Sequence, residues 1–192
     1  DIFKKMEMIL EWLIGITFWS LFVLTFPDRV SGFHAITIVI LSVCSLNELI
    51  SEVGRHIYTS TYFIITLLQM ISRHDWLKVI HHLISIVGMY IGFNDRDGYW
   101  LDTKLGSRVM FIEASTPLLH IYKQTNSKIV GLLFAVSFIL LRTFWLGYIM
   151  HEIWGMGHVS NFLTMQWLLN QIWTVQIIRK FSGSSSNHMK SD

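Results

Sequence analysis

The sequence predicts an all-α protein, a polytopic membrane bundle of about seven transmembrane helices. The 192 residues are 52% hydrophobic and only 15% charged, whereas soluble domains carry about 25% charged residues. Apolar runs near the length of about 20 residues that crosses a bilayer as a helix recur along the chain. The runs lack the two-residue alternation of a membrane β-barrel. We therefore expect helices, because a helix forms its backbone hydrogen bonds within one segment and needs no water in the lipid to complete them.

Seven ranges of the chain have the composition of a span. Pro27 ends the first range, and the polar, glycine-containing loop 94–103 separates the fourth from the fifth. We expect residues 1–180 to form a single membrane domain and the polar, serine-rich residues 181–192 to form a disordered tail. The expected spans are residues 6–26, 33–49, 58–71, 76–93, 105–122, 128–148 and 161–178, and an extension of the short third span toward Arg55 is the alternative.

The distribution of lysine and arginine between the two sides predicts the orientation. Seven spans place the chain ends on opposite sides, and cytosolic connections carry the excess of positive residues. The C-terminal side has slightly more of them, so we expect a cytosolic C-terminus. That side holds Arg29, Arg73, Lys123, Arg179, Lys180 and Lys190, against Lys4, Lys5, Arg55, Arg96 and Lys104 on the other.

Ionisable residues inside two consecutive spans predict a polar site within the bundle. His81 and His82 lie in the fourth range and Glu113 lies in the fifth. An ionised side chain at the centre of a span costs about 3 kcal/mol, so these residues should face the interior. The helical rise places the histidines and Glu113 within about 5 Å of the same depth. We therefore predict that His81 or His82 reaches Glu113 directly or through one water, with Ser85 supporting either imidazole.

A polar stripe on the fifth range and an arginine in the sixth extend this site. Glu113, Thr116 and His120 follow at spacings of three and four residues, which places them on one face of a helix. Arg142 interrupts the very apolar sixth range. We predict that Arg142 faces the bundle and pairs with Glu113. Arg108 is an alternative partner for Glu113, and contact with an anion or headgroup is an alternative role for Arg142.

The residues leave structural pairing, lipid binding and chemistry open as roles for this site. In the chemical alternative a carboxylate orients a histidine that acts as base or nucleophile. The nine histidines show no metal-ligand spacing on one helix face, so no metal is expected. Range 161–178 has no lysine for a retinal Schiff base, and the net charge of +2 gives no reason to expect a nucleic-acid partner.

Four stretches, in this order, resemble the motifs of the TLC-domain (TRAM/LAG/CLN) family of membrane proteins. Together they cover most of residues 28–180. The stretches are DRVSGFHA with His34, VIHHLISIVGMY with His81 and His82, RVMFIEASTP with Arg108 and Glu113, and FILLRTFW with Arg142.

The resemblance implies helices arranged around a central cavity open to lipid, in the endoplasmic reticulum or another internal membrane. In the ceramide synthase branch, paired histidines and paired aspartates serve the transfer of an acyl group from acyl-CoA to a sphingoid amine. Here Glu113 and Thr116 stand in place of the aspartates. The chain is therefore closer to the small TLC-domain proteins linked to membrane phospholipid composition and lipid trafficking.

The resemblance thus predicts a protein of lipid handling or membrane lipid homeostasis, with membrane lipids as partners and no cofactor. The alternative is an acyltransferase with acyl-CoA as substrate and His81, His82 and Glu113 as catalytic residues. In either case the residues expected to line the lipid or substrate cavity are His34, Ser85, Thr116, His120 and Arg142.

Overall fold

The computed structural model describes residues 2–94 and 99–186, and within these ranges it consists of helices joined by short turns, with no strand. Five long helices and the short α5 are regular. Two further stretches are continuous but composite, and each contains a segment that departs from α-helical geometry. The regular helices are α1 (Ile2–Thr25), α2 (Val30–Leu46), α3 (Glu52–Ser72), α4 (Trp76–Phe93), α5 (Tyr99–Asp102) and α10 (Gly157–Ser186).

The first composite stretch joins α6 (Leu105–Met110), the 3-10 helix η1 (Phe111–Ser115) and α7 (Thr116–Thr125). The second joins α8 (Lys128–Ile139), the π-helix η2 (Leu140–Trp145) and α9 (Leu146–Glu152). The described chain therefore has seven long helical stretches, in the order of the seven ranges predicted from sequence.

The all-α prediction is confirmed, and three stretches of the described residues are long and apolar enough to cross a membrane. They are Met6–Thr25, Trp76–Phe93 and Lys128–Glu152, whereas the apolar helix Val30–Leu46 is shorter. Several predicted boundaries were wrong. The third helix begins at Glu52 rather than 58, because Ser51 caps its first turn by accepting a hydrogen bond from the Gly54 amide at 2.9 Å.

Two segments predicted to be irregular are partly helical. The loop 94–103 contains α5, and its residues 95–98 lie outside the described part. The last helix starts before residue 161 and continues to Ser186, into the range expected to be a disordered tail. Residues 187–192 lie outside the described residues.

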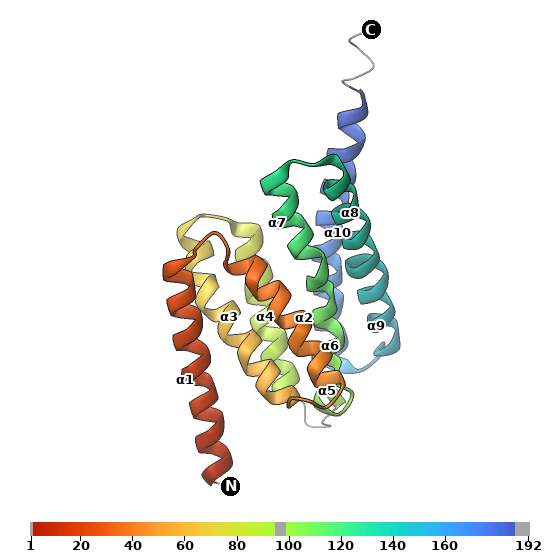
Figure 1. Ribbon diagram of the computed structural model, residues 1–192. Helices are drawn as coiled ribbons and strands as arrows, with labels where there is room; N and C mark the ends of the chain where they lie inside the picture. The colour runs from red at the N-terminus through yellow and green to blue at the C-terminus, as the bar shows by residue number, and fades with distance from the viewer. Residues whose placement is uncertain (1, 95–98, 187–192) are drawn as a thin grey trace.

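The long stretches run alternately up and down, so that the two chain ends lie at opposite ends of the bundle (Figure 1). Helix α1 stands at the outer edge and packs mainly on α3, which packs on α4. Helix α4 in turn packs on α10, and α2 packs on α6, η1 and α7. The turns α1–α2, α3–α4 and α7–α8 lie together at the end nearer the C-terminus, which we call the mouth end.

Two apolar clusters hold the bundle together on either side of its centre. One cluster surrounds Trp19 and Tyr62 between α1, α3 and α4, and the other joins Trp100, Ile149 and Leu163 at the end opposite the mouth. Gly88 permits the close contact between α4 and α10, because a Cβ at this position would collide with the ring of Phe162. This packing leaves the space near the mouth end open.

A closed polar cluster lies at the end opposite the mouth. Glu52 and Arg55 form an ion pair of 2.6 Å within α3, and their side chains are 6% and 1% exposed. Glu52 also accepts hydrogen bonds from Ser45 Oγ and from the amide and hydroxyl of Ser107. The assignment of Arg55 to a connection between spans was therefore wrong, since it lies inside the bundle.

Candidate functional site

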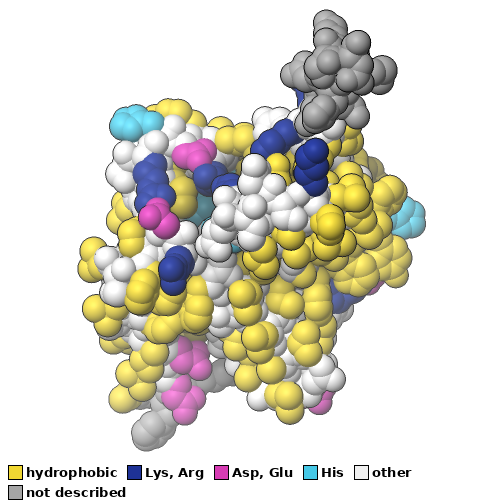
Figure 2. Space-filling view, turned by 45° about the horizontal axis from the view of Figure 1, so that its top comes forward, with side chains coloured by type: hydrophobic (Ala, Val, Ile, Leu, Met, Phe, Trp, Pro, Cys, Tyr) yellow, Lys and Arg dark blue, Asp and Glu magenta, His cyan; other side chains and the backbone are white. Residues whose placement is uncertain are grey.

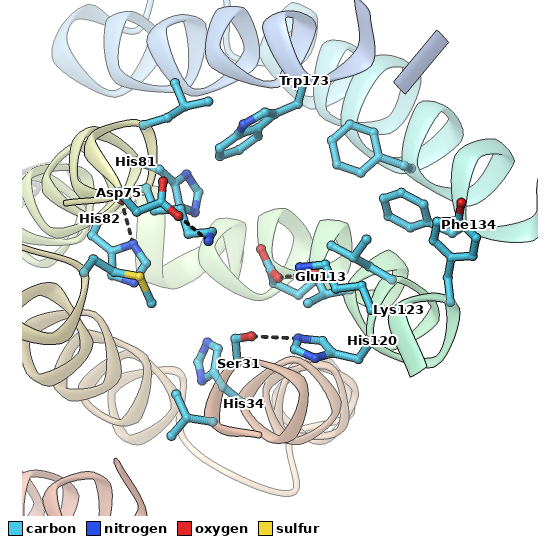
Figure 3. Close-up of a pocket in the computed structure, with 18 of the residues that line it drawn as sticks. Ser31, His34, Asp75, His81, His82, Glu113, His120, Lys123, Phe134 and Trp173 are labelled. Atoms are coloured by element: carbon cyan, nitrogen blue, oxygen red, sulfur yellow. Dashed lines mark hydrogen bonds and ion pairs between the residues drawn. The ribbon is translucent and has the colours of Figure 1, made fainter. Parts of the chain in front are cut away.

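The space near the mouth end is a cavity of about 730 Å³. Residues of α2, α3, α4, η1, α7, α8, η2 and α10 line it, and it opens beside the α1–α2, α3–α4 and α7–α8 turns. Its volume lies in the range of about 300–1,000 Å³ that is typical of small-molecule sites. Figure 3 shows side chains from α2, α4, α7, α8 and α10 pointing into this common space.

The floor of the cavity is the ion pair between Glu113 and Arg142. Arg142 Nη2 donates to Glu113 Oε1 at 2.9 Å and to Thr116 Oγ1 at 3.2 Å. Thr116 Oγ1 lies 2.8 Å from the other carboxylate oxygen. The predicted pairing of Arg142 with Glu113 is confirmed, and Arg108 instead contacts Glu152 with two hydrogen bonds.

The other two nitrogens of the Arg142 guanidinium also have protein acceptors. Nη1 donates to Asn170 Oδ1 at 3.1 Å, and Nε lies 3.5 Å from Ser115 Oγ. The guanidinium further lies 5.0 Å from the ring centroid of Phe138. Because its charge is paired with Glu113 and each of its three guanidinium nitrogens has a protein acceptor, Arg142 supports the floor of the cavity.

Both members of the floor pair lie where the helix leaves α-helical geometry. Glu113 is in the 3-10 segment η1, and the amide of Thr116 donates to its carbonyl, three residues back. Pro117 has no N–H to make the next bond, from position 117 to that same carbonyl, so the disturbance beside Glu113 follows from the proline. Arg142 lies in the π-helical η2, which packs on η1. Such π segments occur frequently at functional sites.

His81 and His82 line the same cavity. Their hydrogen-bond partners are not Glu113, which the sequence had predicted, but residues of neighbouring helices and of α4 itself. The amide nitrogen of Gln166 in α10 lies 3.0 Å from His81 Nδ1. His82 Nδ1 donates to the carbonyl of Lys78 at 2.9 Å, and its Nε2 lies 2.9 Å from Thr66 Oγ1 in α3. Helix α4 packs between α3 and α10, so the two imidazoles, about 100° apart on the helix, meet these neighbours first.

His34 is a buried polar side chain of the cavity that has no hydrogen-bond partner among the described residues. It projects from α2 into the cavity and is 2% exposed (Figure 3). Its ring stacks on Tyr62 with centroids 3.5 Å apart and planes inclined by 3°. Among the described residues, neither ring nitrogen has a hydrogen-bond partner. A buried polar group without a hydrogen-bond partner lowers the stability of the folded protein by about 1–3 kcal/mol.

The other predicted cavity residues fall into two groups. Thr116 and His120 line the cavity, and His120 Nε2 lies 2.7 Å from Ser31 Oγ, which joins α7 to α2. Ser85 is not among the residues that line this cavity, and it lines a small pocket of about 20 Å³ that His81 and Glu113 also line. It faces the well-packed region around Phe162, which leaves little room there.

Sequence reasoning missed the polar partners that α3 and α10 supply. Thr66, Gln166 and Asn170 are buried and bond to the histidines or to Arg142. Gln166 and Asn170 stand four residues apart in an apolar range, a spacing that places them on one helix face. That spacing could have identified them as part of the site.

The rim of the cavity is charged and mainly basic. Arg73 pairs with Asp28 at 3.3 Å, and Lys78 pairs with Asp75. The hydrogen bond from Lys78 is the main reason that the pKa of Asp75 lies below its ordinary value. Figure 2 shows Lys and Arg side chains gathered at this end, with two groups of acidic side chains among them. Lys123 and Lys180 complete the charged rim.

Within residues 2–94 and 99–186, no three His, Cys, Asp or Glu side chains are grouped in a way that could hold a metal ion. A scan against protein-family models and searches of curated proteins and of solved structures find no match for this chain.

Proposed function

We propose that this chain is an integral membrane protein that binds a lipid in the cavity above Glu113 and Arg142. The observation that carries the proposal is the unpaired imidazole of His34, which borders a cavity of about 730 Å³. A ligand with a hydrogen-bond donor or acceptor that reaches this ring would remove the cost of the unpaired nitrogens. The aromatic walls, which include Phe134 and Trp173, suit an acyl chain.

We further propose a seven-span, TLC-like domain in an internal membrane such as the endoplasmic reticulum, with a role in membrane lipid homeostasis. Residues on which the family resemblance rests, His34, His81, His82, Glu113 and Arg142, all line one cavity. The mouth end carries most of the basic residues and lies on the side of the C-terminus, which favours a cytosolic mouth. Protection of a C-terminal tag from protease in sealed microsomes would reverse this orientation.

The direct test is to identify what the purified protein carries. We expect native mass spectrometry of the protein in mild detergent to show one lipid per chain. His34→Phe keeps the ring that stacks on Tyr62 but removes both nitrogens, and it should lower lipid occupancy severalfold. His151→Phe, at an exposed histidine outside the cavity, is the matched control.

Two results would contradict the proposal. The proposal of lipid binding would be wrong if the folded wild-type protein retained no lipid. An acyl group attached covalently to His81 or His82 would assign acyl transfer from acyl-CoA in place of lipid binding.

A further inference from the structure

The charges around the mouth of the cavity are unequal. Four basic side chains and two acidic ones line this outer part. Each acidic residue pairs with one base, Asp28 with Arg73 and Asp75 with Lys78. Within the described residues, Lys123 and Lys180 have no carboxylate within ion-pair distance. Among the described residues, the outer part of the cavity therefore has two more basic than acidic side chains, and Asp75 acts on Lys123 only through a longer-range electrostatic interaction.

The two lysines come from different helices and border the same opening. Lys123 lies in the last turn of α7, and Lys180 lies in α10. The ammonium of Lys180 lies 5.2 Å from the ring centroid of Tyr122, a cation–π contact that orients it beside the neighbouring lysine's helix. Tyr122 also packs on Phe181. Because both lysines line the cavity, an anion at its mouth could contact both.

The deeper parts of the cavity do not offer such a place to an anion. The floor contains one carboxylate and one guanidinium, which pair with each other. The donors of Arg142 are directed at Glu113, Thr116, Ser115 and Asn170. Between the floor and the rim, the wall of α8 and α10 is apolar and aromatic, with Phe134, Phe138, Trp173 and Ile177. From outside to inside the cavity thus has a rim with an excess of basic side chains, an apolar wall and a floor formed by an ion pair.

We propose that the ligand of this cavity is a single-chain amphiphile whose anionic headgroup, a phosphate or a carboxylate, is held at the mouth by Lys123 and Lys180. The chain lies along the aromatic wall toward His34. A cavity of about 730 Å³ holds a ligand of drug-like size, which favours one acyl chain over two. This inference rests on the proposed function, because it names the class of lipid that the cavity binds.

The test compares three probes with the same acyl chain on the purified wild-type protein in neutral nanodiscs. The probes are lysophosphatidic acid, the free fatty acid and the uncharged monoacylglycerol. We expect at least one anionic probe to bind about tenfold or more tightly than monoacylglycerol, because charge-assisted hydrogen bonds are stronger than neutral ones. The comparison of the two anionic probes distinguishes phosphate from carboxylate.

Paired variants test where the anion binds. Lys123→Gln with Lys180→Gln should lose about tenfold in affinity for the preferred anionic probe and leave monoacylglycerol binding unchanged. Arg29→Gln with Lys128→Gln removes the same charge at the same end, from exposed residues that do not line the cavity. This control pair should keep the preference for the anionic probe over monoacylglycerol. If the probe were attracted only by the general positive charge of this end, the control pair would weaken the preference as much as the lysine pair does.

The outcomes separate this inference from the proposed function. Equal binding of all three probes by the wild type would overturn the inference and leave lipid binding intact, and no variant is needed for that comparison. Anionic preference that survives the lysine pair, or that falls equally in the control pair, would also overturn it. Failure of all three single-chain probes to bind would also overturn the inference, whereas the proposed function is lost only if the purified wild-type protein carries no lipid in native mass spectrometry.

Discussion

The protein contains two buried Glu–Arg pairs in contrasting surroundings. Glu52 and Arg55 lie one turn apart on α3, and Glu52 accepts five hydrogen bonds in a cluster that lines neither of the two pockets described above. Glu113 and Arg142 come from two different stretches and lie at the bottom of an open cavity. The same two residue types therefore form a closed structural cluster at one end and the floor of a candidate site at the other.

The difference shows that buried charge alone does not mark a site. A buried ion pair with all its partners in place is compatible with a purely structural role, because its remaining groups are satisfied by the protein. The pair at the floor of the cavity differs in its neighbours. His34 has no hydrogen-bond partner, the helices are irregular at both partners, and there is space for a ligand.

Arg55→Met should produce the largest loss of stability. The change leaves Glu52 buried and without its cation, for which we expect a cost of about 3–5 kcal/mol in free energy of unfolding. Thermal unfolding in detergent would measure it, and the folded fraction should bind lipid as the wild type does. Near-wild-type stability would show that the closed cluster does not hold the fold.

Arg142→Met should lower the free energy of unfolding by about 2 kcal/mol, less than Arg55→Met does. The loss is smaller because Glu113 keeps its contact with Thr116 and borders a space that water can enter. Unlike Arg55→Met, Arg142→Met should also reduce lipid occupancy, since the floor of the cavity loses its support. The two variants would be compared by unfolding and native mass spectrometry on the same preparations. If Arg55→Met and Arg142→Met changed lipid occupancy equally, the distinction between a structural pair and a pair that belongs to the site would be wrong.

Adding a methyl group tests the space around each site. A Cβ at Gly106 would lie against the Arg55 guanidinium and 2.8 Å from Glu52 Oε1. Gly106→Ala should therefore destabilise by about 1–2 kcal/mol, as overpacking of a filled interior does. At Gly32 the nearest atoms are the ring of His120 at 3.2 Å, which borders the cavity. That ring can shift, so Gly32→Ala should cost less than about 0.5 kcal/mol.

The smallest effect is expected at the rim. Lys78 and Asp75 are 50% and 36% exposed, and such a pair contributes at most about 1 kcal/mol. Because Lys78 lowers the pKa of Asp75, the stabilisation is present above the ordinary pKa of an aspartate and is lost as the pH falls through the lowered pKa. Lys78→Met should reduce this acid-side pH dependence, because the backbone amide at position 78 and Lys123 remain beside Asp75, and unfolding between pH 2 and pH 6 would measure it.

Much of the architecture could be predicted from sequence because it depends on composition and length. The range 76–93 was predicted with the bounds that α4 has, since Asp75 and Asn94 interrupt a continuous apolar run. The extension of α3 was foreseen only as far as Arg55, and the helix reaches Glu52 because a buried ion pair makes a charged turn part of the interior. From hydropathy alone, such a charged turn is predicted to be a connection between spans.

The site was predicted in part for a similar reason. Glu113 and Arg142 could be paired from sequence because each is a charge in an apolar range and must find a partner. The hydrogen bonds of His81 and His82 could not be predicted, because they depend on which helices flank α4. Packing places Thr66 and Gln166 there, and the order of spans along the chain does not determine such neighbours.

The central claim is that the cavity above Glu113 and Arg142 holds a lipid, and filling the cavity tests it most directly. Leu119→Trp would place an indole in the cavity, whereas Ile121→Trp would add the same group at an exposed residue of the same helix outside it. Lipid occupancy of both variants and the wild type would be measured by native mass spectrometry at matched thermal stability. We predict that Leu119→Trp loses the bound lipid while Ile121→Trp retains it, and equal occupancy in all three proteins would contradict the account.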